Sequence, residues 1–456
     1  MTPSYRDILP RQAELPRRTV LRAGVLGASA LGLNAMLSAC GGQGRPAGST
    51  SADTQIAPPG KAKGTVSMLA FNTQDQSTPG AKAHYERRRV WLEQNPEAEL
   101  RFDSTPFENM VTVATTRYRA GELSDTLSLV PGTLQDGVFP TLAPLDRADF
   151  PDLDETLTLW DFTTLKPGGR EAAGIPIGAQ GTIWYYNKAL FAQAGLDPEN
   201  PPMTWSELTD SVQKLKAAGI TPLTLSRGFA PFFLYAGLLV QFLPQPEQIS
   251  EFRTGKISLT DDRFAVPMQT LVDAVNDGWF AQGWLDKEDS DAEADVASGK
   301  VAMAAGQIGG NNNWAVFDQK LGKDGYGTFL TPLHPDADEQ IAYLTPDLMF
   351  SLNKKSENPA AARSWLAFIG SKEGQEIGLT LGGVLPNRTD VDVASLVDSP
   401  ALARISTLMT SVPANEVALD FLAGAASNTF FSDFPAALAA GDVKGFLAEL
   451  QSQQEG

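Results

Sequence analysis

From about residue 65 onward, short apolar runs alternate with stretches whose apolar residues recur at helical spacing. Residues 65–71 are an apolar run before a polar loop, which predicts a buried strand. The pattern then predicts a helix over 81–95, a strand over 99–103, a helix over 107–118 and a strand over 126–130. This β-α-β-α-β order is typical of a parallel sheet with helices on its faces.

A second run of the same kind follows a Pro- and Gly-containing segment at 166–169. Residues 182–186 predict a strand, and 220–225 predict the next one. Between them, Thr204 and Glu207 have the spacing of a capping box, which predicts the start of an amphipathic helix. The predicted fold class is α/β with two lobes, and the crevice between such lobes is a natural ligand site.

Length and charge narrow the function further. The folded part, about 390 residues, is too long for one hydrophobic core, so two domains are expected. The net charge of −18 becomes more negative once the basic N-terminal segment is removed, which disfavours nucleic acid and anionic lipid as partners. With two histidines and no thiol after Cys40, the chain is poorly supplied for a zinc or haem site, and we predict no metal and no cofactor.

The first forty residues have the pattern of an export signal. The pair Arg17 and Arg18 precedes a short apolar stretch and then the segment 37–40, Leu-Ser-Ala-Cys. The paired arginines are typical of the twin-arginine address, and Leu-Ser-Ala-Cys resembles the lipobox of bacterial lipoproteins, in which the cysteine is acylated. We predict a signal peptide over 1–39 and a lipid-anchored flexible tether over 40–63, which places the protein outside the cytoplasm on the cell membrane. A retained transmembrane anchor over 23–39 is the alternative, but that run is short and rich in glycine.

A set of motifs in a fixed order resembles one known family. The strongest part reads Gly-Ile-Pro-Ile, then Trp-Tyr-Tyr-Asn-Lys-Ala-Leu-Phe, Ala-Gly-Leu and Pro-Met-Thr-Trp-Ser-Glu-Leu, over 174–208. Further matches lie at 120–125, 298–303 and 357–387, with Ser124 where the family usually has proline. Together these resemble the family 1 extracellular solute-binding proteins of ABC importers, in the maltose-binding-like branch that takes sugars.

The resemblance implies a type II periplasmic-binding-protein fold of two α/β lobes joined by two or three crossing segments. Lobe 1 is expected over 64–174 plus about 315–360, and lobe 2 over 175–314 plus about 361–456. The family has no catalytic residues: the lobes close around a solute and deliver it to a membrane permease. The resemblance therefore predicts a monomeric carbohydrate receptor that is not an enzyme, whose partners are a sugar, a permease and, through the lipid anchor only, the membrane.

A sugar pocket needs aromatic rings against the C–H face of the sugar and polar side chains around its hydroxyl rim. Candidates come from loops where the family contacts its ligand, although the loop at 72–75 also fits a capped surface turn. The family has a tryptophan earlier in the loop that contains Trp314. Trp314 either replaces that ring, or the sugar is held mostly by amides. Phe233 is expected in the core rather than at the ligand. The predicted ligand-binding residues are Asn72, Gln74, Asp75, Gln180, Arg227, Phe229, Phe232, Gln307, Asn311, Trp314, Asp347 and Phe431.

Two other functions stay open. One is an ABC receptor for a non-sugar polar solute, although a phosphate ligand is disfavoured because Arg227 is the single basic residue among the candidates. The other is a carbohydrate-acting enzyme of the cell wall. Ser211 and Ser351 each begin an S-x-x-K motif, but neither is accompanied by the S-D-N or K-T-G motifs that penicillin-binding nucleophiles need.

Overall fold

The computed structural model describes most of the chain beyond the predicted tether. It covers residues 55–71, 73–106, 109–130, 133–165, 169–253, 255–308, 313–415, 422 and 424–455. The predicted signal peptide, Cys40 and most of the predicted tether lie outside the described residues. Within these ranges, no helix is long and apolar enough to span a bilayer.

The first lobe is built on three parallel strands. β1 (Lys63–Phe71) lies between β2 (Glu97–Thr105) and β3 (Thr126–Leu129), and pairs in parallel with both. The connecting helices are α2 (Pro79–Gln94) and α3 (Met110–Ala120), which confirms the β-α-β-α-β order predicted for this segment. Shorter elements complete the connection to the next lobe: η2 (Thr133–Thr141), β4 (Leu142–Ala143), β5 (Leu145–Asp146), η3 (Arg147–Asp149), α4 (Pro151–Thr156), η4 (Trp160–Phe162) and β6 (Glu171–Ala172).

The second lobe surrounds β8 (Thr221–Thr224) and β9 (Val301–Gln307), which pair in parallel. The predicted capping box is present: Thr204 Oγ1 accepts from the backbone N of Glu207 at 3.3 Å, and the Glu207 carboxylate accepts from the backbone N of Thr204 at 3.0 Å. The helices of this lobe and its outer strand are α5 (Lys188–Gln193), α6 (Trp205–Ala217), α7 (Ala230–Phe242), α8 (Pro246–Arg253), α9 (Asp262–Asn276), η5 (Trp284–Asp286), α10 (Asp289–Ala297), α11 (Asn313–Leu321) and β10 (Tyr326–Phe329).

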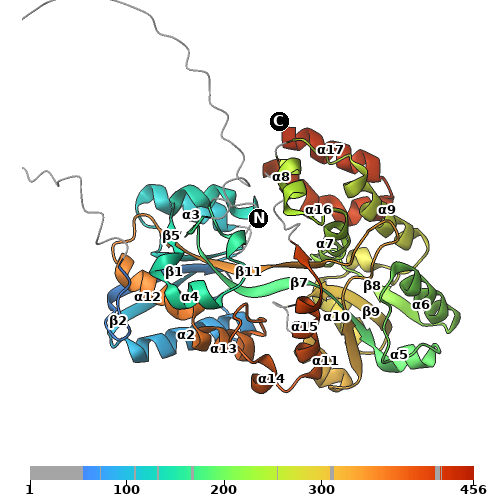
Figure 1. The fold of residues 1–456 in the computed structure, drawn as a ribbon, viewed down its shortest axis with the longest axis horizontal. Coiled ribbons are helices and arrows are strands. Elements are labelled where there is room, and N and C mark those ends of the chain that lie inside the picture. The colour runs from blue at the N-terminus through green and yellow to red at the C-terminus, as the bar shows by residue number, and fades with distance from the viewer. Residues whose placement is uncertain are drawn as a thin grey trace, which may run out of the picture.

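Two long strands carry the chain between the lobes. β7 (Ile175–Asn187) and β11 (Ala342–Asn353) are antiparallel partners in their middle, where Gln180 lies opposite Thr345. Towards the first lobe β11 pairs with β3, and towards the second lobe β7 pairs with β9. The strand order is therefore β2-β1-β3-β11-β7-β9-β8, one sheet that runs through both lobes (Figure 1).

A third crossing follows the helix α13 (Lys372–Gly382), where Asn387 joins the crossing segments. Its Oδ1 accepts from the backbone N of Gly178 at 2.9 Å and from the side chain of Gln375 at 2.8 Å. Its Nδ2 donates to the carbonyl of Thr158 at 2.8 Å. The chain then ends in α14 (Val393–Leu396), α15 (Pro400–Ser411), β12 (Ala414–Asn415), α16 (Gly424–Ala440) and α17 (Val443–Glu455).

Core packing assigns the C-terminal half differently from the boundaries expected from the sequence. The helix α12 (Pro359–Gly370) lies in the core of lobe 1, where Trp365 packs 5.6 Å from Trp91, although residues from 361 onward were assigned to lobe 2. Conversely, α11 and β10 pack in lobe 2, and β10 pairs with β7 there, although 315–360 was assigned to lobe 1. The resemblance predicted that the chain returns to lobe 1 at about residue 315. In the structure it returns along the long strand β11, which pairs with β3 of lobe 1 at Met349–Leu352.

The close pairing of the crossing strands can be tested at Gly181. A Cβ atom there would lie 2.1 Å from the carbonyl oxygen of Tyr343, a backbone atom that cannot move aside alone. We expect Gly181→Ala to lower the free energy of unfolding by about 1–3 kcal/mol, as overpacking does in other cores, measured by urea denaturation. Gly80→Ala is the control, because nothing lies within 4 Å of its Cβ position. Equal stability of the two variants would contradict the prediction.

Candidate ligand cleft

A cavity of about 650 Å³ lies between the lobes, against the crossing strands. Its walls come from the start of α2 in lobe 1, the start of α7 and the end of β9 in lobe 2, the middle of β7 and β11, and the end of α13. Such a volume is in the range of small-ligand sites. The polar and aromatic residues that line the cavity include Phe71, Thr78, His84, Arg87, Gln180, Phe229, Phe233, Gln307, Tyr343, Thr345 and Asp347.

One carboxylate and one guanidinium face this cavity from opposite elements. Asp347 lies on β11 beside the crossing, and the side chain of Gln180 on β7 donates to its Oδ1 at 3.4 Å. Burial raises the pKa of Asp347 to about 6, although the positive charge of Arg87 and the Gln180 hydrogen bond act in the opposite direction. The carboxylate therefore has few partners within the protein and can accept hydrogen bonds from a ligand.

Arg87 is the positive partner, positioned by the packing of α2 against α13. Its side chain is 5 % exposed, and its Nε donates to the carbonyl of Gly374 at 2.7 Å. Gly378 makes room for the guanidinium, since a Cβ there would lie 2.1 Å from Arg87 Nη2. Burial lowers the pKa of Arg87 to about 10, and Asp347 opposes this shift. Arg87 donates to the Gly374 carbonyl and Asp347 accepts from Gln180, and no ion pair within 4.0 Å joins the two in the described part of the chain, so both groups keep hydrogen-bonding capacity for a ligand.

His84 lies one turn before Arg87 on the same helix. It is buried, and burial together with the charge of Arg87 lowers its pKa to about 3, so the ring is neutral at physiological pH. Its Nδ1 has no hydrogen-bond partner among the residues described. A buried ring nitrogen without a partner is costly, so His84 adds a polar group to the cavity wall at the expense of stability.

Aromatic rings supply much of the remaining wall. Phe71 ends β1, Tyr343 begins β11, and Phe229 and Phe233 come from the start of α7. Phe229 is 40 % exposed, and its ring lies 6.0 Å from that of Phe431. An exposed ring at a cavity wall offers a flat apolar face to a ligand.

Of the residues predicted from the sequence, the structure brings four to the cavity wall: Gln180, Phe229, Gln307 and Asp347. Gln74 instead bonds the side chain of Ser104, and Asp75 accepts from Ser77 in a capped turn, the alternative considered for that loop. Asn72 and Asn311 lie outside the described residues. Ligand contact by the four remains a prediction.

The other four predicted residues lie elsewhere. Arg227 is exposed and forms an ion pair with Glu288. Phe232 is 2 % exposed in the core of lobe 2. Its neighbour Phe233 lies in the same core, as expected, and also lines the cavity. Phe431 packs 5.1 Å from Phe232, and Trp314 is buried, with its Nε1 3.5 Å from the carbonyl oxygen of Gly383.

The sequence reasoning missed Arg87 and His84. Both lie on α2 within a segment, His-Tyr-Glu-Arg-Arg-Arg, that looks like the solvated face of a helix. The available signal was helical spacing, because Ala81, His84, Arg87 and Trp91 recur every three or four residues. In the structure these residues lie on the buried side of α2, and His84 and Arg87 line the cavity.

The comparison with protein families identifies the chain. A sequence model of the bacterial extracellular solute-binding proteins matches residues 72–376. The chain belongs to this family. Its members are extracellular solute-binding proteins, so the chain is a receptor that captures a solute and not an enzyme.

Solved structures share the fold at low identity. One from a study of xylan utilization by the thermophilic bacterium Caldanaerobius polysaccharolyticus has a TM-score of 0.70 at 21 % identity, over 85 % of this chain and 99 % of its own. The maltose-bound MalE3 of T. maritima has a TM-score of 0.68 at 18 % identity, over 86 % and 99 %. These likenesses confirm the α/β periplasmic-binding-protein fold.

Curated relatives match over shorter stretches. The sn-glycerol-3-phosphate-binding periplasmic protein UgpB of Salmonella paratyphi A is 53 % identical over 45 residues, which is 10 % of either chain. The chain thus matches only a small part of this relative's length, and the match by itself says nothing about the solute.

The raised pKa of Asp347 gives a pH-dependent stability. Between its unfolded value near 4 and the folded value of about 6, the folded state binds more protons at this site, so its contribution to stability falls as the pH rises through that window and is level above it. We expect the stability of the wild type relative to Asp347→Asn to fall by about 1–2 kcal/mol between pH 4 and pH 7, a value discounted for partial exposure.

Urea denaturation across this pH range measures the difference. Asp75→Asn is the control, because hydrogen bonds from Ser77 lower the pKa of Asp75, so any trend there has the opposite sign. A difference between wild type and Asp347→Asn that does not change with pH would contradict the assignment.

Proposed function

We propose that this receptor binds a mono- or oligosaccharide in the cleft and delivers it to an ABC importer by closure of the lobes. The observation that carries the proposal is the chemistry of the cavity wall: aromatic rings together with one carboxylate, one guanidinium and neutral amides and hydroxyls. Sugars present C–H faces to rings and hydroxyls to polar groups, and this wall offers both.

The charge balance of the cavity favours a neutral ligand. Among the described lining residues, Arg87 is the one cation and Asp347 the one anion. Opposite charges on separate walls suit a ligand whose hydroxyls both donate and accept, since Asp347 accepts and Arg87 donates. A phosphorylated solute would gain from Arg87 and lose against Asp347, which disfavours the glycerol phosphate named for some relatives.

Structural neighbours support a sugar without deciding which one. They include a chitin oligosaccharide binding protein, a maltose-bound receptor and a receptor with an exclusive preference for β-D-galactopyranose. All lie at or below 20 % identity, so they suggest the class of ligand and leave its identity to experiment.

Closure of the lobes would act through the crossing strands. β7, β11 and the segment at Asn387 are the places where a rotation of one lobe relative to the other must be absorbed. The residues around this hinge include Asp347 and Gln180, so ligand contacts and hinge geometry are coupled.

We also propose that the receptor is held at the membrane through an acylated Cys40. The support is the sequence alone: the lipobox-like Leu-Ser-Ala-Cys follows an export signal with paired arginines, and Cys40 is the single cysteine of the chain. The acidic folded part would then be tethered above the membrane.

A screen of the purified receptor against mono- and disaccharides, polyamines and glycerol phosphates tests the function. We expect one sugar to raise the melting temperature with its concentration. With that sugar, Asp347→Asn and Phe229→Ala should each weaken binding by about tenfold or more in calorimetry, from loss of a charged acceptor and of a stacking face.

Arg227→Ala is the control, since this exposed side chain pairs with Glu288 away from the cavity, and its affinity should match the wild type. If only a charged non-sugar raised the melting temperature, the protein would still be a receptor, but its ligand would not be a carbohydrate. Hydrolysis of a sugar by the purified protein would contradict the whole proposal.

A further inference from the structure

The N-terminus of α7 lies at the lobe 2 wall of the cleft. Phe229, the residue before the helix, lines the ligand cavity with its ring, and Ala230 is the first helical residue. A helix N-terminus carries unpaired backbone N–H groups and a partial positive charge, so it attracts anions. What occupies these donors affects which ligands the cleft accepts.

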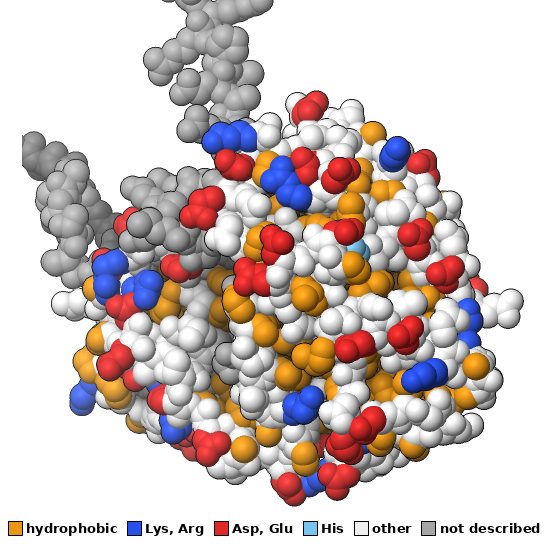
Figure 2. All heavy atoms as spheres, turned by 45° about the vertical axis from the view of Figure 1, so that its right-hand side comes forward, with side chains coloured by type: hydrophobic (Ala, Val, Ile, Leu, Met, Phe, Trp, Pro, Cys, Tyr) orange, Lys and Arg blue, Asp and Glu red, His pale blue; other side chains and the backbone are white. Residues whose placement is uncertain are grey.

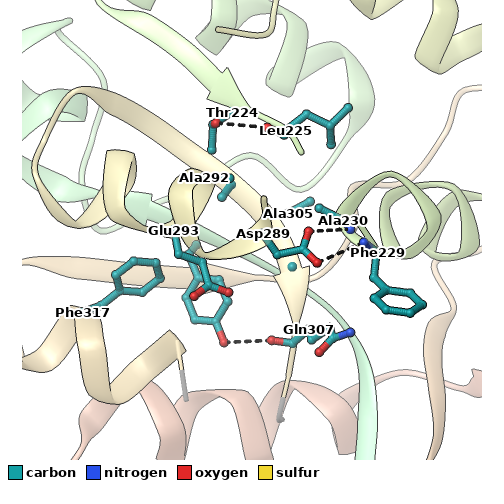
Figure 3. A pocket seen from close by; sticks show the side chains of 13 residues that line it. Thr224, Leu225, Phe229, Ala230, Asp289, Ala292, Glu293, Ala305, Gln307 and Phe317 are labelled. Carbon is teal, nitrogen blue, oxygen red and sulfur yellow. Dashed lines mark hydrogen bonds between the residues drawn. The ribbon is translucent and has the colours of Figure 1, made fainter. Parts of the chain in front are cut away.

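Here a carboxylate of the protein itself occupies them. Asp289, the first residue of α10, accepts from the backbone N of Phe229 at 3.0 Å and from that of Ala230 at 3.2 Å (Figure 3). The hydroxyl of Ser226 donates to the same carboxylate. Three donors therefore meet at one carboxylate, and donors and acceptor lie about sixty residues apart in the chain.

The surrounding backbone is shaped to admit this carboxylate. A Cβ atom at Gly228 would lie 2.4 Å from Asp289 Oδ2, so glycine leaves the space that the carboxylate fills. The backbone N of Gly228 donates to Ser226 Oγ at 3.2 Å, which orients the hydroxyl towards Asp289. The donors and the space together form an anion cradle that is already filled.

This cradle adjoins the ligand cleft. Asp289 lines a small cavity of about 30 Å³ whose walls also include Phe229 and Gln307, and both of these residues line the large cavity as well. In Figure 3 the Asp289 carboxylate faces Ala230 and Phe229, and Gln307 lies below it. Phe229 and Gln307 are thus walls that the small cavity beside Asp289 shares with the ligand cavity.

A second carboxylate adds to the negative charge beside the small cavity. Glu293 lies one turn further along α10 and lines the same small cavity. Burial raises the pKa of the neighbouring Tyr185 hydroxyl, and the charge of Glu293 adds to that shift. The nearby basic residues Arg227 and Lys287 form ion pairs with Glu288 and Asp295, and neither lines either cavity.

We propose that Asp289 is a specificity-determining residue that excludes phosphorylated ligands. Its carboxylate takes the helix donors that a phosphate group would otherwise use, and it repels a phosphate in the adjoining cleft. The inference rests on the proposed function, because it assumes that the solute binds in this cleft. It predicts that the receptor distinguishes a neutral sugar from its phosphate ester.

Calorimetric titration with inorganic phosphate, glycerol 3-phosphate and glucose 1-phosphate tests the proposal on the wild type, Asp289→Ala and Asp289→Asn. We expect no measurable binding of the three phosphates to the wild type. Asp289→Ala should bind at least one of them with a Kd about tenfold or more below the detection limit that the wild type fails to reach, because the donors are vacated and a negative charge is lost. Asp289→Asn, which keeps an acceptor at the helix, should gain less.

Asp286→Asn is the matched control, since it removes the same charge from an exposed position close by in the chain and should leave phosphate binding unchanged. The melting temperature of each variant reports folding, and Asp289→Asn decides the question if the alanine variant does not fold. Phosphate binding by the wild type, or no gain in either Asp289 variant, would overturn the proposal. Absence of sugar binding in the wild type would instead overturn the proposed function.

Discussion

The antiparallel pairing of β7 with β11 is the constraint on which the rest of the structure depends. These two strands bring the parallel strands of both lobes into one sheet, and their middle forms the floor of the cleft. Gly181 allows the backbones to approach so closely that any side chain at that position would meet the carbonyl of Tyr343. Because register in a sheet fixes which side chains face which way, this ladder also determines that Gln180 and Asp347 lie together at the floor.

The polar groups of the cleft are buried at a cost in desolvation free energy. Arg87, His84 and Asp347 are polar groups whose burial shifts each pKa towards the neutral form, and none of them is fully satisfied by the described protein partners. Such groups destabilise the empty protein and gain hydrogen bonds when a ligand arrives. The acidic surface, visible as scattered carboxylates in Figure 2, contrasts with the nearly balanced charge of the cavity wall.

The electrostatics of the lobe 1 wall and the lobe 2 wall of the cleft differ. In lobe 1 a buried guanidinium is left available to the cavity, whereas in lobe 2 the positive end of α7 is neutralised by Asp289. This asymmetry matters because sequence matches point to a glycerol-phosphate-binding relative and structural matches to sugar-binding neighbours. Local electrostatics, rather than overall similarity, is what separates these two ligand classes.

The sequence by itself determined the alternation of strands and helices, the capping box at Thr204 and the family, because these signals lie within a few adjacent residues. It also pointed to Gln180 and Asp347 at the cleft. It named Phe232 rather than Phe233 for the ligand cavity, whereas Phe233 lines it, since α7 is apolar on all sides and its periodicity marks no outward face. Nor could it join Arg87 to Asp347, or Asp289 to the start of α7. Those neighbours lie far apart in the chain, and only the pairing of strands and the packing of helices brings them together.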